Sequence, residues 1–410
     1  MAVELCGFIK HSPQLTDSLV RVVETCLLEN VETGLPTPIF AQILSRRAEF
    51  AFVIVQKLHQ ALPDSDLFDR IFAAALRAIQ SSTAEFRHAL TTAGMDYHRS
   101  LLRIIYIALQ ATATREKHSL EFGLRVVDLL DLVVAKGFKD LVQAAHRHPG
   151  STNPQDIALV TAILQAALMI QGVNEIHTGL ANHLHENQTI RAATTLFSWA
   201  EQLADGSDGD PIYGELSVLF LLELSSVPVI AEQLALENIL ELLMSTTLAA
   251  RITQGVTPLS SPRLHTIWSR GLLPLALNLL TNIGPRYGRE IVTFIKFFAP
   301  QIRTALQSWQ KPTVVVLPAV NEFIGICMLF VIIHRMGGNQ ELAAINVPTK
   351  TAGEGAEYLL AHRKYLKSLV AATSEEEEEM LRNDEEGGFV DKVVKGLETV
   401  QRLLQDDGED

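Results

Sequence analysis

Residues 261–309 constrain the fold of this chain most strongly, because each of their segments is built to bury a single face. Ser261-Pro262 is typical of a helix N-cap followed by a first-turn proline. Residues 270–280 begin a second helix, with a proline near its start, where a missing N–H is tolerated. Gly284-Pro285 ends that helix, and residues 291–309 then carry apolar side chains at three- and four-residue steps. The stretch therefore predicts a short helix, a turn, a second helix, a turn and a longer helix.

The same layout recurs along most of the chain. Capping residues followed by proline, such as Asn153-Pro154, and the apolar periodicity predict helices near 14–29, 38–61, 66–80, 83–111, 117–147, 154–171, 174–186, 188–204, 212–224, 228–250, 262–283, 287–309, 313–335, 354–372 and 388–405. Helix pairs recur about every 40–50 residues, the length of a HEAT or armadillo unit. We therefore expect an all-α fold, an α-solenoid of stacked HEAT/ARM-like helical repeats forming a superhelix. The alternative is a large irregular helical domain.

Charge divides the chain into a nearly neutral body and an acidic end. Residues 374–410 carry 14 acidic and 4 basic side chains, whereas residues 1–373 carry 33 and 30. We expect residues 1–373 to form the helical solenoid, residues 374–388 an acidic linker opened by a Ser374/Glu377 capping box, and residues 389–410 a terminal amphipathic helix with an acidic tail. That helix either caps the stack or docks elsewhere. No basic stripe of the kind that binds nucleic acid is present.

The sequence offers no candidate chemistry. The three cysteines are far apart, which fits a reducing compartment and gives no metal-ligand spacing. His183 and His185 lie two apart, so on a helix they point to different sides, and we predict no metal site. We likewise predict no catalytic residues, no cofactor and no small-molecule substrate, because the phosphate-loop, HExxH and GxSxG motifs are absent.

One run of the chain, residues 314–333, is apolar enough to suggest a membrane span. However, it contains Pro318, Asn321 and Glu322, and a charge at mid-membrane costs about 2.5–3.5 kcal/mol on the insertion scale. A helix buried among other helices explains the run without that cost. We therefore predict no transmembrane segment.

Residues 271–280 resemble the second helix of an armadillo unit. Three segments carry a closer likeness: WSRGLLPLALNLLTNIGPR at 268–286, EIVTFIKFFAPQ at 290–301 and EYLLAHRKYL at 357–366. With the acidic tail, they resemble the C-terminal region of the 188-kDa inner-ring scaffold nucleoporins in their fungal form. The resemblance covers essentially the whole chain and rests on general likeness rather than on a diagnostic motif.

The resemblance implies an α-helical solenoid in the inner ring of the nuclear pore complex, at the nuclear envelope in the nucleus. It also implies contact with a linker nucleoporin through a short helical segment, and a chain that is the tail of a larger protein. The chain differs from cargo-binding armadillo proteins in one respect. Those proteins hold extended peptides with a ladder of asparagines, and Asn278 and Asn282 alone do not make such a ladder, so we do not predict that mode of peptide binding here.

The leading hypothesis is a non-enzymatic scaffold whose inter-helix grooves accept an amphipathic partner helix, anchored at positions i, i+4 and i+7. A related hypothesis is weak binding of phenylalanine-glycine repeats in hydrophobic pockets between helices. The alternative is a soluble karyopherin-like transport receptor or cargo adaptor, which would need an acidic concave face for basic cargo. The position of partner-binding residues is unknown from the sequence.

Overall fold

The computed structural model describes residues 9, 12–29, 38–63, 65–82, 95–113, 115, 118–149, 152–170, 174–203, 209–337, 345, 347–382 and 388–406. Within these residues the regular structure is helical, and the backbone pairing outside helices is an isolated parallel bridge between Val315 and Val370. The predicted all-α class is therefore confirmed. The chain forms two compact units, Met1–Ala193 and Thr194–Asp410, which are described separately.

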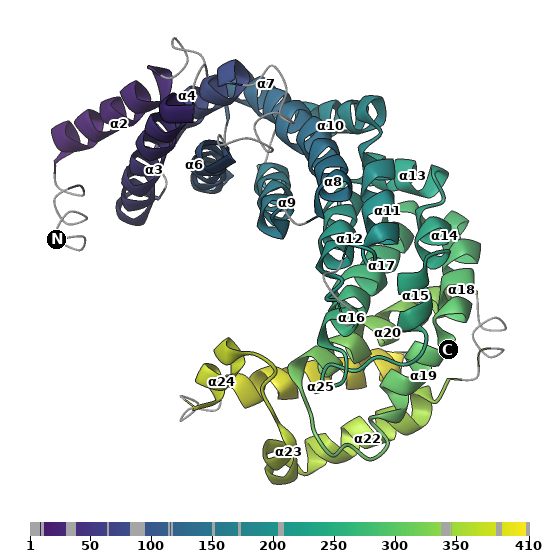
Figure 1. The fold of residues 1–410 in the computed structure, drawn as a ribbon. Coiled ribbons are helices and arrows are strands. Elements are labelled where there is room, and N and C mark those ends of the chain that lie inside the picture. The colour runs from purple at the N-terminus through teal and green to yellow at the C-terminus, as the bar shows by residue number, and fades with distance from the viewer. Residues whose placement is uncertain are drawn as a thin grey trace. The chain divides into compact units, whose positions relative to one another are not determined.

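The first unit consists of helices stacked in two layers (Figure 1). They are α2 (Pro13–Leu28), α3 (Pro38–Ala61), α4 (Leu67–Ser82), α6 (Met95–Ala113), α7 (Leu120–Leu129), the π-helical η1 (Leu130–Gly137), α8 (Phe138–Arg147), α9 (Pro154–Leu168) and α10 (Asn174–Asn187). Helices α3, α6 and α9 pack side by side in one layer, and α2, α4 and α7 follow one another in the other. The pairs α2/α3 and α4/α6 join the two layers, as repeat packing requires.

Capping residues fix where several of these helices begin. The Ser12 side chain accepts a hydrogen bond from the Leu15 N–H, and the Asn153 side chain accepts one from the Gln155 N–H. Each satisfies a backbone donor that a helix leaves free at its first turn. The Asn153-Pro154 start predicted from the sequence is therefore present at α9.

A buried ion pair joins α6 to α9. Arg99 donates from Nε to Asp156 Oδ1 at 2.6 Å and from a terminal nitrogen to Asp156 Oδ2 at 2.8 Å. The Asp156 side chain is 3% exposed and lies in the first turn of α9, where the helix dipole favours a negative charge. This bidentate pair fixes the position of α6 relative to α9, because the guanidinium must bond both carboxylate oxygens at once.

The second unit has shorter and more interrupted helices. After α11 (Thr189–Trp199), at the boundary of the units, follow α12 (Ile212–Ser225), α13 (Pro228–Leu236), α14 (Ile239–Met244), α15 (Thr247–Ile252), α16 (Pro262–Thr266), the π-helical η3 (Ile267–Leu272), α17 (Leu273–Ile283), the 3-10 turn η4 (Gly284–Tyr287), α18 (Gly288–Phe297), α19 (Ala299–Gln307), α20 (Leu317–Arg335), α22 (Thr349–Ala361), α23 (Arg363–Leu369), α24 (Glu375–Arg382) and α25 (Gly388–Asp406).

Residues 228–250, predicted as one helix, form three. The first break is at Asn238, whose φ of 52° lies in the left-handed region that a helix cannot contain. The second is at Thr246, which is extended and accepts a hydrogen bond from the Ala249 N–H as the cap of α15. The prediction of a continuous helix was wrong because apolar periodicity survives such breaks while the helix direction changes.

Residues 262–283, predicted as one helix, are helical throughout, because α16, η3 and α17 follow one another without interruption. The turn that the sequence also suggested before residue 270 is absent. The backbone absorbs the change through the π-helical turn η3, which contains Gly271. A Cβ on Gly271 would lie 2.3 Å from Val218 Cγ1, so this glycine permits the close approach of α12. Ser261 stands at the N-cap without a side-chain hydrogen bond, whereas Gly284 ends α17 at φ 76° as predicted.

The longer helix predicted at 287–309 is also divided. It changes direction between α18 and α19, at the Ala299-Pro300 step, because a proline removes the N–H that would continue the helix. The segment 354–372 similarly forms α22 and α23, with a break at His362.

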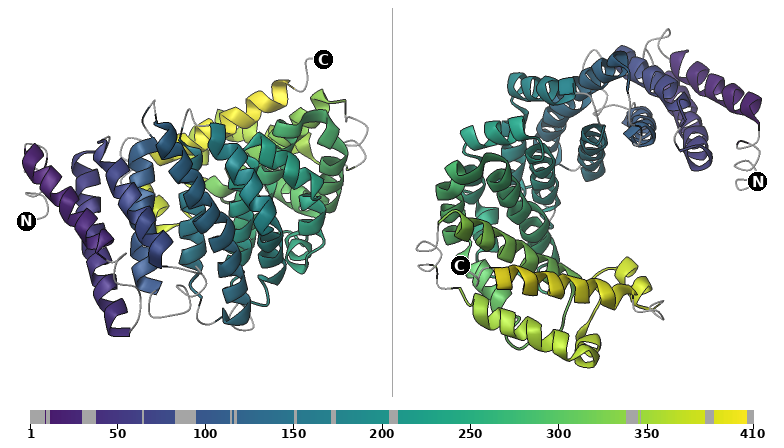
Figure 2. Two further views of the ribbon diagram at one scale, coloured as in Figure 1. Left: turned by 90° about the horizontal axis from the view of Figure 1, so that it is seen from above. Right: turned by 180° about the vertical axis from the view of Figure 1, so that it is seen from behind.

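The last helices of the second unit pack against helices that come earlier in the same unit (Figure 2). Helix α25 lies against α20 and α22, and buries Phe389, Val393 and Leu397. Within the segment predicted as an acidic linker, Glu375–Arg382 forms α24, which packs on α25. Half of the predicted capping box is present, because Ser374 Oγ accepts from the Glu377 N–H, while the Glu377 carboxylate accepts from the N–H and hydroxyl of Thr373, one residue before the cap. Residues 383–387 and 407–410 lie outside the described part.

Candidate partner-binding pockets

A buried polar cluster in the second unit holds four segments together. Glu322 of α20 is 3% exposed, and its Oε1 accepts hydrogen bonds from Trp268 Nε1 at 2.7 Å and Gln301 Nε2 at 2.9 Å. Its Oε2 lies 2.9 Å from His265 Nε2. Gln301 also bonds both backbone groups of Val256. The cluster is fully enclosed and its carboxylate is satisfied, so it fixes α16, η3, α19 and α20 relative to one another and offers no site to a ligand.

This cluster explains the charge inside the apolar run. Helix α20 meets the length and composition criterion for a membrane span, but a buried core helix meets it too, and half of its window is buried. The carboxylate of Glu322 is held by neighbouring helices, and α20 packs against α17, α19 and α25. A buried helix therefore accounts for the run.

Side chains singled out in the sequence have structural contacts. The His183 Nδ1 lies 3.3 Å from Asp131 Oδ1, and His185 is exposed. Among the described residues, no group of three or more His, Cys, Asp or Glu side chains lies close enough together to hold a metal ion. Asn278 and Asn282 both donate to Ser225, to its Oγ and its carbonyl oxygen, and so bind α17 to α12. Their amides are used within the fold rather than presented to a peptide.

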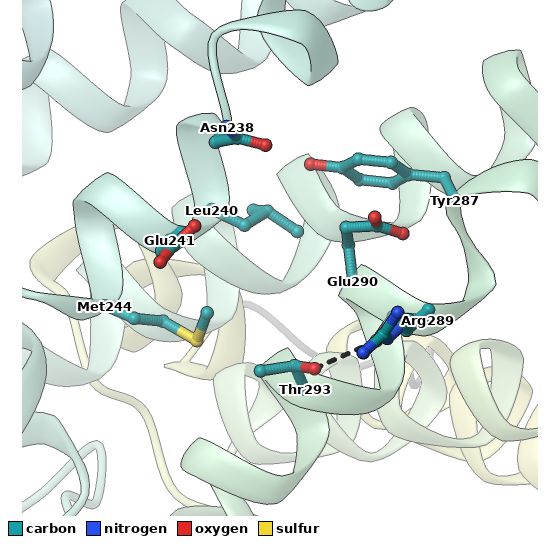
Figure 3. A pocket seen from close by; sticks show the side chains of 8 residues that line it. All are labelled: Asn238, Leu240, Glu241, Met244, Tyr287, Arg289, Glu290 and Thr293. Atoms are coloured by element: carbon teal, nitrogen blue, oxygen red, sulfur yellow. Dashed lines mark hydrogen bonds between the residues drawn. The ribbon is translucent and has the colours of Figure 1, made fainter.

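A pocket between α14 and α18 is the first candidate for partner binding (Figure 3). Its volume is about 270 Å³, and it is lined by Asn238, Leu240, Glu241 and Met244 on one side and by Tyr287, Arg289, Glu290 and Thr293 on the other. Two irregular points of the backbone create it. Asn238 separates α13 from α14, and η4, which begins at Gly284, brings Tyr287 to the start of α18.

The floor and rim of this α14/α18 pocket differ in polarity. Leu240 and Tyr287 are buried, Met244 is half-buried, and Glu241 and Glu290 are exposed at the rim. Burial, with the nearby Glu290 carboxylate, raises the pKa of the Tyr287 hydroxyl, so the phenol stays protonated at neutral pH. The pocket thus combines an apolar floor, a neutral hydroxyl and charged edges.

A second pocket lies between α22 and α25. Its volume is about 570 Å³, and it is lined by Thr349, Lys350, Gly353, Glu354, Glu357, Gln401, Leu404 and Gln405. Gly353 brings the two helices close, because a Cβ there would lie 2.7 Å from Leu404 Cδ1. The result is an apolar centre with a polar edge, the usual construction of a docking groove.

Sequence reasoning did not find either pocket. The lining of each comes from helices that are distant in sequence, and periodicity does not predict which of them pack together. The local signals for the α14/α18 pocket were Asn238 within an apolar run and an aromatic residue shortly after Gly284-Pro285.

Comparison with known proteins gives a consistent set of relatives. A family model described as the nuclear pore protein NUP188 C-terminal domain matches residues 71–404. Nucleoporin NUP188 of Chaetomium thermophilum is 29% identical over 334 residues, which cover 74% of this chain and 18% of the relative. Nucleoporin NUP188 of Saccharomyces cerevisiae is 24% identical over 441 residues, which cover 97% of this chain and 26% of the relative. The chain therefore spans about a quarter or less of the length of these curated relatives.

A solved structure agrees with the sequence matches. A fragment of Nup188 from Myceliophthora thermophila superposes with a TM-score of 0.69 at 29% sequence identity. The match covers 82% of this chain and 98% of that fragment. The helical stack described above is therefore the fold of that fragment.

Proposed function

Because the chain belongs to the family of the nuclear pore protein NUP188 C-terminal domain, we propose that it is a non-enzymatic part of the inner-ring scaffold that docks helices of a linker nucleoporin. Its relatives are nucleoporins, which places it at the nuclear pore complex in the nucleus. A related mode, weak binding of phenylalanine-glycine repeats between helices, belongs to the same proposal. The soluble transport receptor is not favoured, because the matches are to nuclear pore proteins.

The observation that carries this proposal is the larger pocket, between α22 and α25. Its volume of about 570 Å³ exceeds that of a single side chain, so it accommodates consecutive anchors of an amphipathic helix. Leu404 supplies an apolar contact at its centre, and the surrounding glutamate, lysine and glutamine side chains supply a polar rim. The pocket lies entirely in the second unit, on helices that the fold holds in place.

Calorimetric titration tests the proposal. The purified chain is titrated with fragments of the linker nucleoporin and separately with a phenylalanine-glycine repeat segment, each at low and high salt. Leu404→Gln should weaken binding of the linker fragment, whereas Leu403→Gln, next to it on α25 but outside the pocket lining, should leave the affinity nearly unchanged. An apolar helix-in-groove contact should also tolerate salt.

Each other outcome has a definite meaning. Weak, salt-tolerant binding to the repeats alone would favour a transport-receptor-like role. Equal loss in both leucine variants would remove the α22/α25 pocket as the contact. No heat with either fragment would overturn docking by this part of the chain while leaving its family membership unchanged.

A further inference from the structure

The smaller pocket, between α14 and α18, contains a buried tyrosine, Tyr287. The Tyr287 residue is 5% exposed, and its hydroxyl points into the α14/α18 pocket, toward Asn238 and Leu240 (Figure 3). Within the described part of the chain, no residue makes a hydrogen bond to this hydroxyl, and its oxygen opens onto the cavity rather than being fully enclosed. Water bonds such a hydroxyl in the free protein, and a ligand that displaces the water must replace that bond, so the hydroxyl favours an occupant with a polar group.

Two carboxylates face the same cavity from opposite walls. Glu241 comes from α14 and Glu290 from α18, and neither forms an ion pair with a described residue. Arg289 also lies on the rim, and its guanidinium likewise has no acidic partner in the described chain. Two negative charges against one positive leave the lining negative by one charge. Arg289 therefore reduces the attraction for a cation without reversing it.

The walls below this rim are apolar. Leu240 and Met244 provide an aliphatic surface, and the ring of Tyr287 provides an aromatic one. A long side chain with an aliphatic stem and a cationic head matches this arrangement, since its stem would cover the apolar wall while its head reached the carboxylates. Arginine fits better than lysine, because a planar guanidinium pairs with a carboxylate in two-pronged fashion and stacks on aromatic rings.

We propose that the pocket between α14 and α18 binds an arginine side chain presented by a partner protein, with Glu241 and Glu290 pairing with the guanidinium and Tyr287 contributing a hydrogen bond and its ring. This assignment rests on the proposed function only in that the arginine belongs to a docking partner. A purely apolar side chain would cover the hydroxyl without bonding it. An anionic side chain would meet two like charges.

A methyl-resonance titration tests this directly. Met244 lines the pocket, and the chain has 7 methionines, so a protein labelled at the methionine methyl groups gives few resonances, one of which reports on the pocket. The probes are the acetylated amides of arginine, lysine, citrulline and leucine at millimolar concentration. Citrulline keeps the shape of arginine but has no charge. The Met244 resonance is assigned by its loss in Met244→Leu.

We expect the Met244 resonance to shift and saturate with the arginine probe, more weakly with lysine, and not with citrulline or leucine. Glu290→Gln and Glu241→Gln should each weaken arginine binding about tenfold, the worth of a charged hydrogen bond. Tyr287→Phe should weaken it by a smaller factor. The matched control is Glu232→Gln, an exposed glutamate of α13 outside the pocket, which should leave the affinity unchanged.

Several results would overturn the assignment. An equal shift with citrulline would mean that the cationic charge is not recognised, and a larger shift with leucine would make the pocket an apolar anchor site. No shift with any probe would show that the pocket is closed in solution. These results are independent of the linker titration, because that experiment reads binding to the α22/α25 pocket through Leu404.

Discussion

Replacing Glu322 by leucine should destabilise the second unit by about 4 kcal/mol. The change removes the acceptors of Trp268 Nε1 and His265 Nε2, while Gln301 Nε2 keeps the carbonyl oxygen of Val256. Two buried donors thus lose their partners, and each such loss costs about 1–3 kcal/mol. Leucine removes the free-energy cost of burying the carboxylate. However, the polar groups that bonded the carboxylate stay buried without a partner, so the net effect on stability is unfavourable.

A graded variant separates the charge from the hydrogen bonds. Glu322→Gln keeps the shape and one acceptor oxygen, and its amide can donate to His265 Nε2 if the proton moves to Nδ1, which lies 3.4 Å from Ser269 Oγ. The remaining loss is the weakening of the charge-assisted bonds from Trp268, Gln301 and His265 to neutral ones, about 2 kcal/mol in total. The expected order of unfolding free energy is therefore wild type, then glutamine, then leucine.

Urea unfolding followed by tryptophan fluorescence is the suitable assay. All three tryptophans, Trp199, Trp268 and Trp309, belong to the second unit, so the fluorescence reports on that unit while circular dichroism reports on both. Glu232→Gln, an exposed change, should fall within about 0.5 kcal/mol of wild type. If Glu322→Leu unfolds with the wild-type midpoint and slope, the cluster contributes no net stability and the reasoning is refuted.

Three further predictions concern other parts of the fold. Asp156→Ala leaves the partly buried Arg99 without the carboxylate that it pairs with across α6 and α9. It should lower the unfolding free energy of the first unit by about 3 kcal/mol, measured by circular dichroism in urea. Burial lowers the pKa of His98 to about 4. Between pH 6.5 and 4 the His98 imidazole is therefore protonated in the unfolded chain but stays neutral in the folded chain. Stability should therefore fall by about 3 kcal/mol between pH 6.5 and 4, at 1.36 kcal/mol per pKa unit, and His98→Phe should lose this dependence. Gly355→Ala should lower the melting temperature, since its Cβ would lie 1.8 Å from the Trp309 carbonyl oxygen, whereas Gly288→Ala has open space and should raise it slightly.

The local signals of the sequence predicted most helices, and they failed where a break leaves the apolar pattern intact. Asn153-Pro154 and Gly284 marked a start and an end correctly, because capping and left-handed backbone are decided by neighbouring residues. Asn238 breaks a run whose periodicity continues on either side, so the prediction joined α13, α14 and α15. The π-helical turn η3 had the reverse effect, because it keeps a helix continuous where the sequence suggested a turn.

The polar cluster and the pockets depend on information that no local pattern contains. Glu322 was recognised as a charge in an apolar run, but its partners His265 and Trp268 precede it by more than fifty residues and Gln301 by 21. The packing of α16, η3 and α19 around α20 brings them together. Because pocket linings arise from the same long-range packing, the sequence predicted none of the residues that line the two pockets.

The packing of α25 on α20 also bears on how the protein is made. In a simple repeat array each helix finds its neighbour as soon as the next repeat leaves the ribosome. Here α20 ends at Arg335, but its partner α25 begins only at Gly388. Val320, which comes within 2.5 Å of where a Cβ on Gly396 would lie, stays uncovered by α25 until those later residues have been synthesised. The nascent chain therefore exposes this apolar face of α20 while the intervening segment is made, and a transiently exposed apolar surface of this kind favours aggregation, which chaperones counter.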